Sequence, residues 1–148
     1  MTMRTLALAF VWVLVMATAA SAEPTMTAIH NGSLMTMTRT GPSGMVIQYA
    51  QPRPDLLGLV GPGTVLVQGH WEGPPPQIFV GEARVFSRYC GSIPYPVRGV
   101  VDATQSLMLF GAAPQFDTAC RVIAFDINSQ QAVLRFEPPS LPPPGAQR

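Results

Sequence analysis

The chain has 148 residues, of which 47% are hydrophobic and 11% are charged, and its formal net charge at pH 7 is +1. All nine basic residues are arginine, and they are scattered singly along the chain. A nucleic-acid-binding domain carries its basic residues in a cluster. The composition therefore disfavours nucleic acid as a partner.

Residues 1–22 have the pattern of a bacterial signal peptide. Arg4 supplies the positive charge, residues 6–16 form an unbroken apolar run, and Ala20-Ser21-Ala22 is a small-x-small cleavage site. The alternative is a transmembrane anchor, which needs about 20 apolar residues, and this run is shorter. No cysteine stands at the cleavage point, which disfavours a lipoprotein. We expect a periplasmic or secreted bacterial protein with no stable membrane anchor after cleavage.

The remaining sequence has the length of one domain, long enough to bury a substantial core. We assign residues 23–137 to an exported β domain. Residues 138–148 are rich in proline, and we interpret them as a disordered tail.

Alternating apolar residues and turn signals indicate β-strands rather than helices. Residues 34–39 alternate, with Met35 and Met37 on one face, and a Gly-Pro-Ser-Gly turn follows. The chain then returns over residues 45–50, which places Met45, Ile47 and Tyr49 together. This pattern predicts the first hairpin.

A loop rich in proline and glycine follows over residues 51–63, and residues 64–71 form the next predicted strand. Residues 74–76 are all proline and cannot continue a strand ladder, because proline lacks the amide donor. Residues 77–87 are predicted as another strand, in which Gly81 indicates a bulge or close packing.

The last third of the chain contains shorter apolar runs. We expect strands over residues 97–102 and 107–111, and a final pair over residues 118–126 and 131–136 joined by residues 127–130. In total, about eight short strands with short connections predict an all-β fold, a small antiparallel meander barrel or sandwich. A closed barrel would protect the sheet edges.

Cys90 and Cys120 are the only cysteines. In an oxidising compartment such a pair is most simply a disulfide, which would join the loop before the strand at Val97 to the strand containing Val122. The alternatives, a redox pair or a zinc site, need the C-x-x-C spacing or further ligands. In the chain-entropy model the disulfide stabilises the fold by about 3 to 4 kcal/mol.

The sequence contains no motif that indicates catalysis, a metal site or a cofactor. The only histidines are His30 and His70, and no G-x-S-x-G elbow, calcium loop or zinc helix accompanies them. The glycines at 58, 61 and 63 lead into a strand without the lysine and helix of a phosphate loop. We therefore expect a non-enzymatic protein without metal or cofactor.

Aromatic residues are the remaining candidates for a binding site. Trp71, Tyr89 and Tyr95 flank predicted turns and would lie at the mouth of a barrel, where ligand sites often occur. We take Trp71 and Tyr95, with His70 beside Trp71, as candidate ligand contacts. Five phenylalanines are expected in the core: Phe79, Phe86, Phe110, Phe125 and Phe136.

Several segments together resemble a small exported β-rich module of uncharacterised bacterial proteins. They are residues 30–35 (HNGSLM), 52–56 (PRPDL), 62–66 (PGTVL), 81–86 (GEARVF), 90–99 (CGSIPYPVRG) and 111–114 (GAAP). In some proteins of this kind the module is appended to a caspase-like peptidase domain. The resemblance implies an accessory or binding role and transfers no activity or site residue.

Three functions remain open from the sequence. The first is binding of a protein or envelope component by an exported, non-enzymatic domain. The second is a lipocalin- or avidin-like barrel that binds a small molecule and has an apolar cavity near Trp71 and Tyr95. The third is an unrecognised hydrolase, in which His70 would lie within hydrogen-bonding distance of a serine or carboxylate in a cleft.

Overall fold

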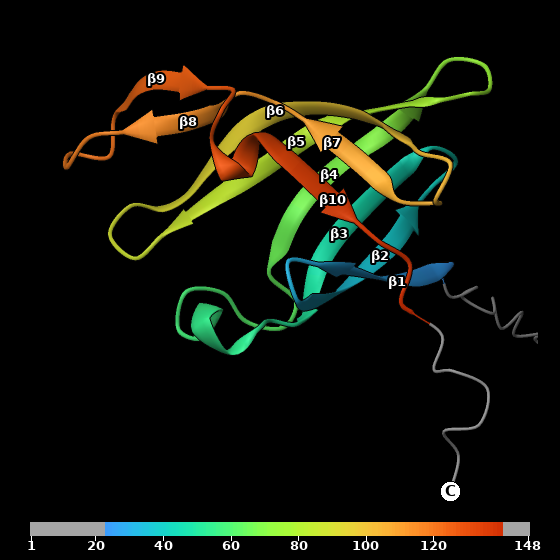
Figure 1. Ribbon diagram of the computed structural model, residues 1–148, viewed down its shortest axis with the longest axis horizontal. Helices are drawn as coiled ribbons and strands as arrows, with labels where there is room; N and C mark the ends of the chain where they lie inside the picture. Colours follow the sequence, from blue (N-terminus) through green and yellow to red (C-terminus); the bar gives the residue numbers. More distant parts are fainter. Residues whose placement is uncertain (1–22, 141–148) are drawn as a thin grey trace, which may run out of the picture.

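The computed structural model describes residues 23–140, which form an antiparallel all-β structure with one disulfide (Figure 1). Eight strands make one sheet in the order β1-β2-β3-β4-β5-β6-β7-β10, and β8 and β9 pair separately as a hairpin. The strands are β1 (Thr25–His30), β2 (Ser33–Thr40), β3 (Gly44–Gln51), β4 (Val65–Glu72), β5 (Ile78–Ser87), β6 (Gly91–Val101), β7 (Leu107–Phe110), β8 (Ala113–Phe116), β9 (Val122–Asp126) and β10 (Val133–Phe136). Two short 3₁₀ helices, η1 (Pro54–Leu56) and η2 (Gln130–Ala132), lie in the connections.

The eight-stranded sheet curls until its first and last strands meet, and it forms a nearly closed barrel. The Ile29 amide donates to the Glu137 carbonyl at 2.8 Å, and the Glu137 amide donates to the Ile29 carbonyl at 2.9 Å. This bridge covers part of the strand edges that an open sheet would expose. The all-β, antiparallel prediction is confirmed, and the nearly closed sheet favours the barrel over the sandwich.

Local sequence explains the tight turn that starts the barrel. Asn31 and Gly32 both have positive φ, 46° and 79°. This is the Asn-Gly hairpin turn, which matches the right-handed twist of the flanking strands. It sets β1 against β2 with Ile29 opposite Leu34.

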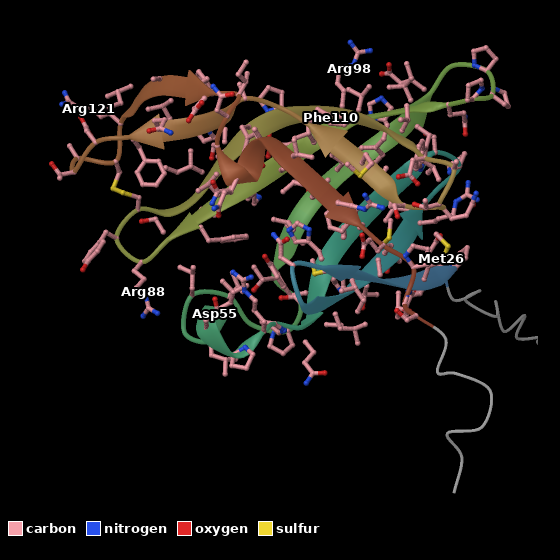
Figure 2. All side chains as sticks on the ribbon, viewed as in Figure 1. Met26, Asp55, Arg88, Arg98, Phe110 and Arg121 are labelled. Carbon is pink, nitrogen blue, oxygen red and sulfur yellow. A yellow bond between two sulfur atoms is a disulfide. The ribbon has the colours of Figure 1, made fainter. Side chains whose placement is uncertain are left out.

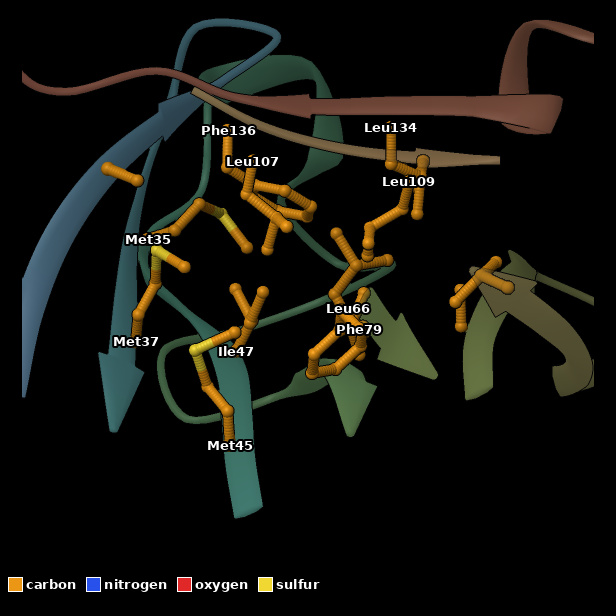
Figure 3. Close-up of a cluster of buried hydrophobic side chains, with 14 of the residues drawn as sticks. Met35, Met37, Met45, Ile47, Leu66, Phe79, Leu107, Leu109, Leu134 and Phe136 are labelled. Carbon is orange, nitrogen blue, oxygen red and sulfur yellow. The ribbon is translucent and has the colours of Figure 1, made fainter. Parts of the chain in front are cut away.

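The core consists of the side chains that point into the barrel at every second position of each strand (Figure 3). On β2 and β3 these are residues that the predicted alternation groups on one face of each strand, and Met35, Met45 and Ile47 are at most 2% exposed. The largest fully buried side chains are Tyr95, Phe79, Phe136, Met35, Met45, Ile47, Leu109, Val67 and Val97. Side chains therefore fill most of the interior.

Gly81 marks close packing rather than a bulge. It lies opposite Gly69 on β4, and the β4–β5 and β5–β6 registers run without a shift. A Cβ atom at Gly81 would stand 2.4 Å from the Gln68 carbonyl oxygen and 2.9 Å from the Phe79 ring. The glycine pair thus makes room for the fully buried Phe79 ring.

The strand predicted over residues 97–102 is wrong at its start, because β6 begins at Gly91 and includes Pro94 and Pro96. Its first half pairs with β5 alone, since β7 joins β6 only from Arg98 onward. Proline is tolerated where one side of a strand needs no amide donor. The two prolines therefore lie in the half of β6 that is free on one side.

The predicted final strand pair is also wrong. The strand β9 pairs with β8, which the sequence analysis missed, and β10 pairs with β7. Residues 118–121 form the turn of the β8–β9 hairpin, and residues 130–132 are η2 rather than strand. The strand β1 was also missed, so the described chain contains ten strands instead of about eight. The β8–β9 hairpin is an excursion from the meander, which local periodicity does not reveal.

Two of the five phenylalanines expected in the core lie outside it. Phe79 and Phe136 are 0% and 1% exposed, and Phe86 packs against the core from a partly buried position. Phe110 and Phe125 are 50% and 60% exposed, and Figure 2 shows Phe110 on the outer surface. Phe110 occupies the outward position of β7, and Phe125 lies on β9 outside the barrel.

The predicted disulfide is present, and it joins two turns rather than a loop and a strand. Cys90 ends the β5–β6 turn and Cys120 lies in the β8–β9 turn, with a Cα–Cα distance of 5.3 Å. The bond ties the β8–β9 hairpin to the projecting end of the β5–β6 hairpin (Figure 2). The predicted signal peptide, residues 1–22, and most of the predicted tail, residues 141–148, lie outside the described residues.

Candidate functional site

The two ends of the barrel are built differently. At one end, on the right of Figure 1, lie the connections β2–β3, β4–β5 and β6–β7, the start of β1 and the end of β10. At the other end lie the long loop of residues 52–64, the β5–β6 turn, the β8–β9 hairpin and η2. We call these the mouth and the closed end.

The mouth contains a cavity of about 410 Å³. A volume of this size is within the range of small-molecule sites. Most of its lining is apolar, and all of it comes from strands or loops that end at the mouth. The lining residues are Met26, Thr27, Ala28, Met37, Arg39, Met45, Trp71, Gln77, Val101, Gln105, Leu107, Phe136 and Pro138.

Three methionines form one wall of the cavity, and the strand register explains their proximity. Met26 on β1 lies directly opposite Met37 on β2. Met45 on β3 lies opposite Arg39, one inward position along from Met37. Side chains in these direct and diagonal positions are close enough to touch across a sheet. Met37 and Met45 are 8% and 2% exposed, and Met26 at the rim is 55% exposed.

Trp71 also lines the cavity, together with the three methionines. It lies near the end of β4, where its backbone amide donates to the Ser43 carbonyl at 2.9 Å. Its ring meets the buried Phe79 ring edge to face, with centroids 5.4 Å apart. Aromatic pairs prefer this arrangement, so Phe79 holds the indole in place beneath the opening.

The rim of the cavity carries one charged side chain among the described lining residues, Arg39. Its Nη2 donates to the Pro42 carbonyl at 3.0 Å, which holds the guanidinium at the β2–β3 turn. The amide side chains of Gln77 and Gln105 also line the opening. The cavity therefore combines an apolar interior with a rim that carries one positive charge.

The closed end contains a smaller pocket, of about 160 Å³, with polar and apolar side chains in its lining. Tyr95 is 2% exposed, and its hydroxyl donates to the Gln131 carbonyl of η2. Burial, with a smaller contribution from the nearby Tyr49, raises the pKa of Tyr95 to about 12. Tyr95 therefore remains a neutral hydrogen-bond donor at physiological pH.

His30 is the second buried polar group at the closed end. Its Nδ1 lies 2.8 Å from the Arg135 carbonyl, and its ring stacks on Phe136 with centroids 4.8 Å apart. Burial lowers the pKa of His30, and the nearby Arg53 lowers it further, whereas the bond to Arg135 acts in the opposite direction. The imidazole is thus held neutral, and a neutral ring that donates from Nδ1 to this carbonyl joins the two closing strands.

The three candidate ligand contacts predicted from the sequence lie in three different places. Trp71 lines the mouth cavity. Tyr95 belongs to the packed closed end, and Tyr89, also expected at the mouth, is 95% exposed in the β5–β6 turn. His70 lies on the outer surface of the barrel, on the face of β4 opposite to that of Trp71.

His70 has a carboxylate neighbour, as the hydrolase hypothesis required. Its Nε2 lies 2.9 Å from Glu72 Oε1, and both side chains are about half exposed. His70 borders a shallow, open depression on the outer face of β3, β4 and β5, where the one hydroxyl among the described lining residues is that of Thr40. The pair fits a solvated contact on the surface, which contributes little free energy.

Most residues of the mouth cavity were not identified from the sequence. The alternation predicted for β2 placed Met37 on one face with Met35, and that of β3 placed Met45 with Ile47 and Tyr49, so part of the signal was present. Met26 lies on β1, which was not predicted, and its pairing with Met37 emerges only from the register. Arg39 contributes to the rim because β2 ends at the mouth.

Two surveys of the described residues gave negative results. No cluster of three or more His, Cys, Asp or Glu side chains that could hold a metal ion occurs in residues 23–140. Within the same part of the chain, no helix combines the length and apolar character needed to cross a membrane.

Comparisons of the chain with protein-family models, curated proteins and solved structures found no match.

Proposed function

We propose that this protein is an exported, non-enzymatic binding module that takes the apolar part of a small amphipathic molecule into the mouth of its barrel. The observation that carries the proposal is the 410 Å³ cavity, which is lined largely by apolar side chains and is larger than the pocket of about 160 Å³ at the closed end. The ligand is an acyl chain or similar apolar body of an envelope or extracellular component.

The charge at the rim indicates the polarity of the ligand. Arg39 is the charged side chain of the lining, and an arginine pairs well with a carboxylate or phosphate. An anionic head group would lie at the β2–β3 turn while the apolar body contacts Met37, Met45 and Trp71. The disulfide and the signal-peptide pattern support a periplasmic or secreted location for this binding.

Titration with decanoate and with decanol tests the proposal, because the two probes share an acyl chain and differ in charge. Protein recovered from the periplasm after expression of the full chain is titrated by calorimetry and by the fluorescence of Trp71. We expect both probes to bind, and decanoate to bind more tightly. Arg39→Gln should lower the affinity for decanoate about tenfold, since one charge-assisted hydrogen bond contributes about 1.5 to 3 kcal/mol. The affinity for decanol should stay unchanged.

Tyr89→Ala is the matched control, because Tyr89 is exposed at the opposite end of the molecule. It should bind both probes as the unaltered protein does. Equal affinity of the Arg39→Gln variant and the unaltered protein for decanoate would exclude the head-group assignment. No heat and no fluorescence change with either probe would exclude the cavity as a site for this class of ligand.

The β9 strand supports a second candidate, binding of a protein partner. Ile123, Phe125 and Ile127 occupy alternate positions and are 67%, 60% and 75% exposed, and β9 has one sheet neighbour, β8. An exposed apolar edge strand is suited to pairing with an extended segment of another protein. A Phe125→Ser variant should lose any envelope protein that the unaltered protein retains, whereas Phe110→Ser, at an equally exposed position, should keep it.

A further inference from the structure

The methionine wall of the mouth has a chemistry beyond apolar packing. We propose that the thioethers of Met26, Met37 and Met45 form a binding site for a soft monovalent metal ion, Cu(I) or its analogue Ag(I). The proposal goes beyond the binding of an amphipathic molecule and requires only the cavity and its register.

The strand register brings the three side chains together from three adjacent strands. Met26 and Met37 are direct cross-strand partners, and Met45 is the diagonal neighbour of Met37. All three line the same cavity, and Figure 3 shows the side chains of Met37 and Met45 extending into the barrel from neighbouring strands. Long side chains in direct and diagonal positions lie within reach of one another, and methionine has three rotatable bonds with which to orient its sulfur.

Thioether sulfur selects among metal ions. It is a soft, neutral donor that favours Cu(I), whereas carboxylate and carbonyl oxygens favour magnesium and calcium. Three thioethers at the mouth, without a carboxylate among the described lining residues, therefore match a soft monovalent ion. Zn(II) and Ca(II) would find no suitable ligands on this wall.

Two further features favour a cation at this place. The mouth is open to solvent at Met26, which is 55% exposed, so an ion has a route of entry. Trp71 lines the same cavity, and the face of an indole ring attracts a cation.

The cysteines do not compete for such an ion. Both are joined in the disulfide, and no free cysteine occurs in the described residues. A soft ion that reaches this protein therefore meets thioethers as its sulfur ligands. Two further methionines lie in the described residues. Met35 is buried in the core. Met108 lies on β7 opposite Val100 of β6, on the outer side of the barrel.

Nuclear magnetic resonance of methionine methyl groups tests the site directly. Protein recovered from the periplasm is labelled with ¹³C at the methionine methyls and titrated with silver nitrate in chloride-free buffer. We expect one equivalent to shift the signals of Met26, Met37 and Met45, assigned by single substitutions to leucine. The signal of Met108 should keep its position, and Zn(II) should shift none of these signals.

The Met37→Leu variant measures the contribution of the central thioether. Leucine conserves the volume, so the variant keeps the fold, and an unchanged thermal transition would verify this. We expect its affinity for Ag(I) to fall at least tenfold, whereas Met108→Leu keeps the affinity of the unaltered protein. The same order of affinities is expected for Cu(I) held reduced by ascorbate in competition with a chromophoric chelator.

Two outcomes would overturn the metal site. One is an affinity for Ag(I) that is the same in Met37→Leu and Met108→Leu. The other is a silver-induced shift of the Met108 signal as large as those of the wall. Decanoate titration of Met37→Leu reports separately on the amphipathic ligand, because leucine keeps the wall apolar while it removes the sulfur.

Discussion

The mouth and the closed end of the barrel are formed by the same strands and differ in the contacts that they contain. At the closed end, a disulfide, the buried Tyr95 hydroxyl and the buried His30 ring each join elements that are distant in sequence. At the mouth, short turns connect neighbouring strands and a cavity takes the place of core side chains. The fold therefore has these three long-range contacts at the closed end, whereas the mouth has the larger of the two cavities.

If this division holds, substitutions at the closed end should lower the free energy of unfolding, whereas substitutions at the mouth rim should alter binding and leave stability nearly unchanged.

The largest effect is expected from the disulfide. Replacing Cys90 and Cys120 together by alanine opens a loop with a sequence separation of 30 residues and should cost about 3 to 4 kcal/mol. Denaturant unfolding measures this loss. A thiol reductant should destabilise the unaltered protein and have no effect on the double variant; equal midpoints for the two proteins would contradict the role of the bond.

Tyr95→Phe should have the next largest effect. The substitution leaves the Gln131 carbonyl without its donor, and an unsatisfied buried group costs about 1 to 3 kcal/mol. Chemical denaturation at pH 7 measures this cost.

Tyr95 also predicts a pH dependence. Because the folded-state pKa is about 12 and the unfolded value is about 10, the folded state retains a proton that the unfolded state releases. The stabilisation is complete below pH 10 and is lost as the pH rises towards 12. Tyr95→Phe should flatten this alkaline loss, and the same slope in both proteins would show that Tyr95 does not titrate with unfolding.

His30→Phe should change the free energy of unfolding less than Tyr95→Phe does, and the change should appear at acidic pH. Burial lowers the pKa of His30, so the unfolded chain binds a proton that the folded chain excludes, and stability falls as the pH drops below about 6.5. Phenylalanine keeps a ring against Phe136 and cannot be protonated. The loss of stability between pH 7 and pH 5, measured by thermal unfolding, should therefore be smaller in the variant than in the unaltered protein.

Met26→Leu at the mouth should have the smallest effect on stability. Met26 is 55% exposed, and a surface substitution of similar volume changes the free energy of unfolding by less than about 0.5 kcal/mol. A loss above 1 kcal/mol in denaturant unfolding would place the mouth among the stabilising parts of the fold. The contrast between the two ends would then fail.

Much of the fold could be predicted from local pattern. The alternation grouped Met35 with Met37 on β2, and Met45 with Ile47 and Tyr49 on β3, and all five side chains are buried. The β8–β9 hairpin could not be predicted in this way, because its apolar residues at Ile123 and Phe125 follow the same period as a core strand. Their exposure depends on where the hairpin leaves the barrel.

The candidate site was less accessible to sequence analysis than the fold. Trp71 was identified because an aromatic residue at a strand end is conspicuous, and it does line the cavity. His70 and Tyr95 resembled it in the sequence, yet one faces outward and the other is buried at the far end. The face of a strand and the end of the barrel reached by a residue depend on register, which a single sequence leaves open.

The amino-acid sequence was sufficient to predict the all-β class, the alternation along the strands and the availability of two cysteines for one disulfide, and it contains the Asn-Gly dipeptide of the first turn. These features depend on interactions between residues that are near in the chain or on the chemistry of one residue type. The tertiary structure alone decided that β10 returns to β1, that β9 leaves the barrel, and that Met26, Met37 and Met45 share one wall. Those results depend on register and closure across distant strands, where free energy is gained only after the whole sheet has formed.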